Sequence, residues 1–234
     1  MSAQLALDFV RHSAQTSRRK SLSQSEDDSM KLYGTTGAGS VAPQAALTHI
    51  GADFELKMLD FKKEEHLAPE FLAINPRGQI PALVLDDGTV ITESAAVLLH
   101  IADMHADSGL IAAPGTTTRA QTYRWMAFLA TNVYEGMLRY MYPEHYTTEE
   151  KHDGVVASGE QVLSRAFAIL NDTLDGRPEL VENFSVADIY MAMLFYWHHD
   201  LPALTAELPH LQPAVDNTLS KPGISDVFSQ NGLI

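Results

Sequence analysis

The stretch FLAINPRGQIPALVLDDGTVITESAAVLLHIAD, residues Phe71–Asp103, carries most of the information about the fold. Asn75-Pro76 ends a short helical segment, because the residue before a proline is pushed out of the helical region. Two apolar runs follow, IPALVL and TVIT, and Asp87-Gly88 between them is a strong signal for a hairpin turn. From Glu93 onward the apolar residues recur with helical period. The stretch therefore predicts a helix, two antiparallel strands and a second helix.

The segments on either side complete the pattern. Upstream, MKLY and FELKMLD are predicted strands, and between them lies a helix in SVAPQAALTHIG that Gly51 is expected to end. Downstream of Thr118 almost everything has helical period, and the apolar run Ile189–Trp197 predicts a buried central helix. Ser185 and Asp188 just before that run form a helix-start signal, and we expect a structural role for both.

This layout predicts an α+β domain over residues 30–106, a linker over 107–117 and an all-α domain over 118–234. The first 29 residues differ from the rest, because they are rich in serine and carry little apolar periodicity. We therefore predict that residues 1–29 form a disordered tail.

The composition argues against several classes of function. The formal net charge of −14 is wrong for nucleic acid, whose phosphates attract Lys and Arg. No apolar run approaches the ~18 residues that a membrane span needs, so we predict neither a nucleic-acid nor a membrane partner. The chain has no cysteine, which excludes disulfides and a protein thiol nucleophile and fits a cytoplasmic location. The histidines lack ligand spacing, so we predict no metal site.

One alternative begins at the loop GTTGAGSVAP, residues 34–43. Within it, Gly37 to Ala42 fit the fingerprint G-x-G-x-x-G/A of a dinucleotide-binding fold, and Asp60 lies at the distance where an acidic residue would hold a ribose. That fold needs further strand–helix–strand units after Asp60. A hairpin and then only helices follow instead, so the pattern disfavours a nicotinamide cofactor.

The combination of Asn-Pro-x-Gly-x-Ile-Pro with Glu-Ser in Phe71–Asp103, followed by a helical segment with FSVADIY, resembles the glutathione transferase superfamily. The resemblance covers about residues 30–230 and is nearest to bacterial beta-like members. It implies a thioredoxin-like N-terminal domain, an all-α C-terminal domain, glutathione as co-substrate and a homodimer.

Four positions are expected to bind glutathione through this resemblance and through their own chemistry. A cis bond at Ile80-Pro81 would present the Ile80 main chain as a strand edge for a tripeptide, whereas the alternative is a proline that only shapes a turn. Glu93 and Ser94 open a helix, and the resemblance assigns them the γ-glutamyl end of glutathione; the alternative is simple helix capping. Lys62 resembles a lysine that steadies the peptide in bacterial members, although KKEE is also an ordinary charged run.

The sequence leaves several candidates for the residue that stabilises the thiolate. Bacterial members have Gly-Ala-Cys-Ser where this chain has Gly-Ala-Gly39-Ser40, and an active-site histidine where this chain has Tyr134. We therefore expect Gly39 to line the glutathione site and Ser40 to stabilise the thiolate, with Thr36 and Tyr33 or main-chain amides as alternatives. A Ser40 that acts only as a helix cap remains the other interpretation.

The second substrate is expected against Tyr134, Met137 and Met141, because methionine and aromatic side chains suit an adaptable apolar pocket. Ordinary helix packing is the alternative for each of them. The resemblance thus predicts a glutathione transferase that holds glutathione as a thiolate and transfers it to an electrophilic, partly apolar small molecule. The alternatives are a glutathione-dependent reductase or lyase, which cleaves disulfides or ethers, and a non-catalytic binding or scaffold module.

Overall fold

A four-stranded sheet in the order β2-β1-β3-β4 organises the N-terminal domain of the computed structural model, which describes residues 30–234. The predicted tail, residues 1–29, lies outside the described residues. β1 pairs with β2 in parallel and with β3 antiparallel, and β3 pairs with β4 antiparallel. The strands are β1 (Lys31–Gly34), β2 (Glu55–Met58), β3 (Ala82–Val84) and β4 (Val90–Thr92).

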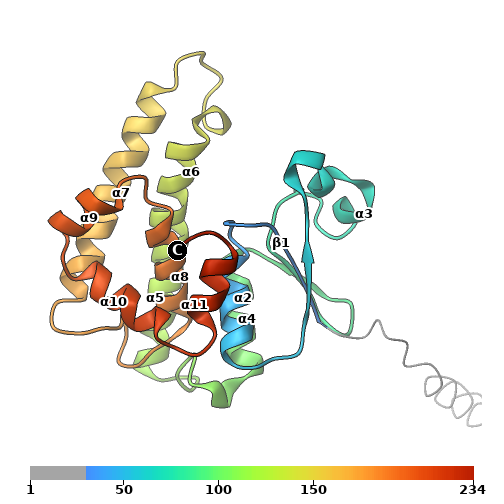
Figure 1. The fold of residues 1–234 in the computed structure, drawn as a ribbon, viewed down its shortest axis with the longest axis horizontal. Helices are drawn as coiled ribbons and strands as arrows, with labels where there is room; N and C mark the ends of the chain where they lie inside the picture. Colours follow the sequence, from blue (N-terminus) through green and yellow to red (C-terminus); the bar gives the residue numbers. More distant parts are fainter. Residues whose placement is uncertain (1–29) are drawn as a thin grey trace, which may run out of the picture.

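Helices cover both faces of this sheet (Figure 1). Because side chains alternate along a strand, Leu32 is buried with α2 and α4, whereas the Tyr33 ring contacts Phe71 of α3, with ring centroids 5.4 Å apart. α2 and α4 lie between the sheet and the helical region, and α3 lies on the other side. The helices of this domain are α2 (Val41–His49), α3 (Pro69–Leu72) and α4 (Ser94–Met104), with short 3₁₀ turns η1 (Phe61–Lys63), η2 (Glu65–Leu67) and η3 (Ala106–Ser108).

The rest of the described chain is helical and packs around α8 (Figure 1). As predicted, residues 186–195 of α8 are all buried. The C-terminal α11 packs on α2, where the Asn231 side chain donates a hydrogen bond to Gln44 Oε1 at 3.0 Å. The elements are α5 (Thr117–Phe128), the π-helical turn η4 (Leu129–Tyr134), α6 (Glu135–Met141), η5 (Pro143–His145), α7 (Asp153–Thr173), α8 (Val186–Tyr196), α9 (Leu201–Glu207), α10 (Leu211–Leu219) and α11 (Ile224–Gln230).

The predicted fold class is confirmed, and so is the hairpin at Asp87-Gly88, because β3 and β4 pair on either side of it. The two antiparallel strands also explain why the dinucleotide alternative fails, since a doubly wound sheet would continue in parallel. Within residues 30–234, no helix is long and apolar enough to cross a membrane. The domain limits at 106 and 118 remain a proposal.

The predicted helix-start signal before α8 is a complete capping box. The Ser185 main-chain N–H and hydroxyl donate to Asp188 Oδ2 at 2.8 and 3.0 Å, and the Leu180 N–H donates to Asp188 Oδ1 at 2.8 Å. Burial of Asp188 outweighs these hydrogen bonds and raises the pKa of its carboxyl to about 6.

This pKa predicts a pH dependence of stability. An unfolded aspartate has a pKa of ~3.9, so between about pH 4 and 6 the folded chain binds more protons than the unfolded chain, and stability falls as pH rises. The shift of about two units is worth about 3 kcal/mol. In urea titrations, the stability advantage of the wild type over Asp188→Asn should shrink by about that amount from pH 4 to pH 7. A difference that stays constant with pH would contradict the raised pKa.

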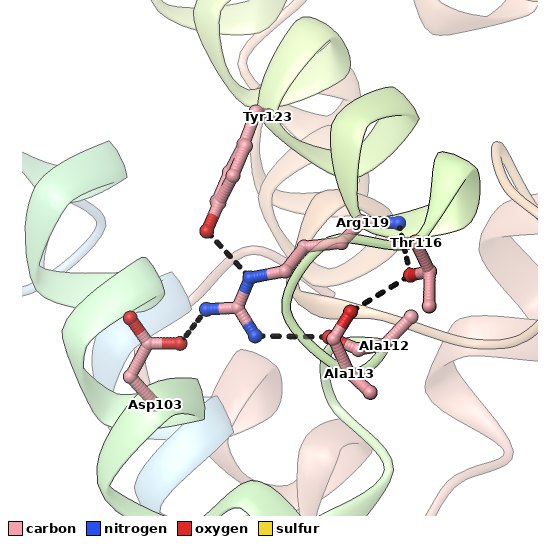
Figure 2. A network of polar contacts seen from close by, with 6 residues as sticks. All are labelled: Asp103, Ala112, Ala113, Thr116, Arg119 and Tyr123. Carbon is pink, nitrogen blue, oxygen red and sulfur yellow. Dashed lines mark hydrogen bonds and ion pairs between the residues drawn. The ribbon is translucent and has the colours of Figure 1, made fainter.

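Arg119 of α5 connects the helical region to α4 of the N-terminal domain (Figure 2). Its guanidinium donates to the Asp103 carboxylate, to the Tyr123 hydroxyl and, at 2.9 Å, to the Ala112 carbonyl. The Arg119 side chain is only 8% exposed, so these partners replace nearly all of its hydration. The ion pair and hydrogen bonds therefore fix how α4 and α5 are joined.

Removing this guanidinium should destabilise the protein. Arg119→Ala is expected to lower the free energy of unfolding by about 2–4 kcal/mol, because the three acceptors lose a nearly buried partner and the stem leaves a gap. The matched control is Arg165→Ala in α7, an exposed arginine without a side-chain partner in residues 30–234, which should change stability by about 0.5 kcal/mol or less. Equal effects of the two variants in chemical denaturation would refute the structural role of Arg119.

Candidate functional site

The loop between β1 and α2, residues 35–40, is the centre of the candidate site. Its Gly39 is buried, and the Ser94 hydroxyl at the start of α4 donates to the Gly39 carbonyl at 3.0 Å. An ideally placed Cβ on Gly39 would lie 2.8 Å from Tyr134 Oη, 2.9 Å from Ser94 Oγ and 3.5 Å from Pro81 Cδ. Gly39 is therefore the point at which α4, the β3 edge and the helical region converge, and any side chain there would displace a neighbour.

The edge of β3 beside this loop offers unpaired main-chain groups. The Ile80-Pro81 bond is cis, and the N–H and C=O of Ile80 have no hydrogen-bond partner among the described residues. The turn before Ile80 is fixed by the buried Asn75, whose side chain donates to the Gln79 carbonyl at 2.6 Å and accepts from the Arg77 N–H at 3.2 Å. Asn75 thus holds the turn that leads to the Ile80 main chain.

The start of α4 lies next to this edge, because Ala82 of β3 pairs with Thr92 of β4. Glu93 follows Thr92 with φ 68° and ψ 114°, a left-handed conformation that is uncommon for a residue with a side chain. Its carboxylate is 67% exposed and accepts a hydrogen bond from Arg77 Nη1 at 2.7 Å. The backbone thus holds an accessible carboxylate directly in front of a helix N-terminus.

Tyr134 brings the helical region into the site. It closes the π-helical turn η4, and π-helical turns recur at functional sites because they change the direction of a side chain. Burial and, secondarily, the nearby Glu93 charge raise the pKa of its hydroxyl to about 12. The Trp197 ring packs edge-on against Tyr134 at 5.1 Å, and Trp197 Nε1 donates to the Gly37 carbonyl at 2.9 Å. Trp197 therefore holds both the tyrosine and the loop.

The side chains that the sequence predicted to stabilise the thiolate point elsewhere. Ser40 is 2% exposed, and its hydroxyl donates to the Thr35 carbonyl and accepts from the Thr35 N–H, both at 3.3 Å. Thr36 is exposed on the turn, and the Tyr33 ring contacts Phe71 across the sheet from Leu32. The structure therefore places Gly39 at the convergence point but none of these three hydroxyls there.

The remaining predicted residues are divided between surface and core. Lys62 is exposed, and its ammonium group has no partner within the part of the chain that the structure describes. Met141 is 45% exposed, whereas Met137 is 1% exposed and packs in the core, where a ligand cannot reach it without rearrangement. Among the predicted electrophile residues, only Tyr134 lies at the convergence point around Gly39.

Reasoning from sequence missed Asn75, Arg77 and Trp197. Asn75 and Arg77 lie inside the diagnostic stretch, so the rule that asparagine side chains fix turns could have identified Asn75. Arg77 and Trp197 act over 16 and 160 residues of sequence separation, and no local pattern signals contacts of that kind.

The comparisons with known proteins agree with this geometry. The family described as Glutathione S-transferase, N-terminal domain, matches residues 28–103. Over 206 residues the chain is 31% identical to glutathione S-transferase GstA of Escherichia coli O157:H7, an alignment that covers 87% of this chain and 100% of that protein. The chain belongs to the glutathione transferase family.

Solved structures of other glutathione transferases have the same fold. A sphingomonad glutathione S-transferase complexed with glutathione is 31% identical with a TM-score of 0.73, covering 87% of this chain and 100% of that one. A bacterial beta class enzyme of Sphingomonas chungbukensis is 27% identical with a TM-score of 0.73 and the same coverage. This glutathione transferase is therefore similar to bacterial beta-like members, as the sequence predicted.

The crowding at Gly39 predicts a mutational effect. Gly39→Ala should lower the free energy of unfolding by about 1–3 kcal/mol, because its Cβ would press on Tyr134 Oη and Ser94 Oγ. Gly154→Ala in α7 is the matched control, since a Cβ there meets no atom within 4 Å among the described residues. The control should raise stability by up to about 1 kcal/mol. Urea denaturation of both variants tests this. An unchanged free energy of unfolding in Gly39→Ala would show that the loop can accommodate a Cβ at position 39.

Proposed function

We propose that this protein binds glutathione as a thiolate and transfers it to an electrophilic, partly apolar small molecule. Membership of the glutathione transferase family supports this proposal, as does the similar sphingomonad structure, which is complexed with glutathione. The observation that carries it is the unpaired Ile80 main chain beside the N-terminus of α4.

That arrangement matches the chemistry of glutathione. An extended tripeptide can pair with the free N–H and C=O of Ile80 as an added strand. Its α-carboxylate then accepts hydrogen bonds from main-chain N–H groups at the start of α4, around Ser94. Its α-ammonium pairs with the Glu93 carboxylate, which Arg77 already orients. The exposed Lys62 supplies a positive charge for the other carboxylate of the peptide.

The cysteinyl residue of the bound tripeptide would lie beside Gly39, because Pro81 and Ser94 both contact that position. A free thiol has a pKa of ~8.5, and lowering this value by about two units needs about 3 kcal/mol. Main-chain N–H groups of Gly39 and Ser40 have no hydrogen-bond partner in residues 30–234 and lie at the start of α2. Such amides contribute through hydrogen bonds and through the helix dipole. In this proposal Ser40 therefore acts through its main-chain N–H, because its hydroxyl is hydrogen-bonded to the main chain of Thr35.

In the transfer step the protein accepts no proton and forms no covalent bond. The thiol proton goes to solvent when the thiolate forms, and the sulfur lone pair then makes the carbon–sulfur bond while a leaving group departs with its electron pair. Electrophiles would approach from the side of Tyr134 and the exposed Met141, which suit an apolar substrate.

The test is a titration of glutathione into the purified protein at several pH values, followed by the ultraviolet absorbance of the thiolate. The proposal predicts saturable binding and a thiol pKa about two units below that of free glutathione. Binding with an unshifted pKa would indicate a binding module instead. Consumption of two glutathione molecules with formation of their disulfide would indicate a reductase.

Glu93 provides a specific test of the binding mode. Glu93→Gln keeps the shape of the side chain but removes the charge that would pair with the α-ammonium, so glutathione affinity should fall about 10-fold. Glu64→Gln is the matched control, because Glu64 is an exposed glutamate that also has a positive φ, 56°. Calorimetry should show unchanged affinity for the control, and equal affinities of both variants would remove Glu93 from the binding site.

We also propose a homodimer in the cytoplasm, in line with what the family resemblance implies. Met58, Phe61 and Leu67 are large apolar side chains that are exposed between β2 and α3, as a surface covered by a second copy would be. Light scattering should give twice the mass of one chain, and a monomer at micromolar concentration would contradict the dimer.

A further inference from the structure

The Tyr134 hydroxyl fills the space that a side chain at position 39 would occupy. The separation of 2.8 Å between Tyr134 Oη and an ideal Gly39 Cβ is too short for the hydroxyl to keep its place if a Cβ were present. The glycine and the tyrosine are therefore sterically complementary: this tyrosine position requires a residue without a side chain at 39. The contact joins two residues that are 95 positions apart in sequence and belong to different parts of the fold.

The hydroxyl is held in place and has no hydrogen-bond partner within the described part of the chain. Tyr134 Oη makes no hydrogen bond to any of residues 30–234, and it is not among the fully buried polar atoms that lack one. Its ring packs against Trp197, at a centroid distance of 5.1 Å, and against Tyr190, at 6.3 Å. A donor that is fixed, accessible and unused has free capacity for a ligand atom.

We propose that the Tyr134 hydroxyl donates a hydrogen bond to the glutathione sulfur and is a catalytic residue of this protein, supplied by the helical region. This inference rests on the proposed function, which brings the cysteinyl sulfur next to Gly39. The family resemblance implies that bacterial beta-like members have a cysteine at position 39 and a histidine at position 134. In this protein the phenol of Tyr134, at the position of that histidine, fills the space that the cysteine side chain would occupy at position 39.

The electrostatic surroundings keep this phenol in the donor state. Burial is the largest cause that raises the pKa of Tyr134 to about 12, and the smaller contributions come from Glu93, Tyr142, Glu135 and Tyr146, in that order. The group therefore stays protonated throughout the neutral range. It does not accept the thiol proton, which goes to solvent, but it stabilises the charge that remains on sulfur.

The other hydroxyls of the loop do not compete for this role. The Ser40 hydroxyl donates to the Thr35 carbonyl, and Tyr33 packs against Phe71 on the far face of the sheet. The phenol is thus the side-chain donor closest to the point where Gly39, Pro81 and Ser94 converge.

The experiment compares the wild type with Tyr134→Phe, which removes only an unpaired hydroxyl and should leave the melting temperature nearly unchanged. Thiolate absorbance is titrated against pH with saturating glutathione. The thiol pKa should rise by about one unit in the variant, which is about a 10-fold loss of thiolate below the wild-type pKa. Glutathione affinity measured below pH 6, where the thiol is protonated in both proteins, should change by less than about threefold.

Tyr196→Phe is the matched control, because Tyr196 lies in the same helical region but packs on Phe195 and Phe228 away from Gly39. It should leave the thiol pKa unchanged. An unchanged pKa in Tyr134→Phe, with the wild type showing a lowered one, would overturn this inference and leave the proposed function intact. Absence of glutathione binding to the wild type would overturn both.

A second variant tests the pairing of the two positions, and its first comparison, in the wild-type background, does not depend on how Tyr134→Phe folds. Gly39→Ala should push the phenol away from sulfur and raise the thiol pKa by about one unit in the wild-type background. In the Tyr134→Phe background the same change should raise the pKa much less, because the hydroxyl is already gone. Fully additive shifts would overturn the pairing.

Discussion

Two glycine carbonyls in the loop after β1 connect the parts of this molecule that form the site. The Gly39 carbonyl accepts from the Ser94 hydroxyl of α4, and the Gly37 carbonyl accepts from the Trp197 indole of the helical region. Both bonds require the loop to run close to its neighbours, which the absence of a side chain at Gly39 permits. If the loop were displaced, the strand edge, the α4 N-terminus and Tyr134 would no longer face the same point.

The two parts of the fold contribute different chemistry. The N-terminal domain offers main-chain groups and charge: the Ile80 edge, the Glu93 carboxylate and the amides at the starts of α2 and α4. The helical region offers aromatic rings, because Trp197 and Tyr190 both pack against Tyr134. In the proposed function, the N-terminal domain therefore recognises the peptide, and its α2 amides stabilise the sulfur together with a phenol of the helical region.

Much of the fold could be predicted because its signals are local. The hairpin needs only Asp87-Gly88 between apolar runs, and the α8 capping box needs only Ser185 and Asp188 three residues apart. The candidate site was predicted less completely. Gly39, Pro81 and Ser94 lie together in the structure, but the sequence could not show that the Ser40 hydroxyl turns to Thr35 or that Met137 packs in the core.

The sequence by itself determined the order of elements, the family and the candidate positions within Phe71–Asp103 that are proposed to bind glutathione, because short-range periodicity, turn chemistry and capping are properties of neighbouring residues. Only the tertiary structure decided which hydroxyl faces Gly39. That choice depends on a π-helical turn and on contacts between residues far apart in the chain, such as Trp197 with Gly37. Packing sets the direction of a side chain only after both segments are in place, and no local pattern carries that information.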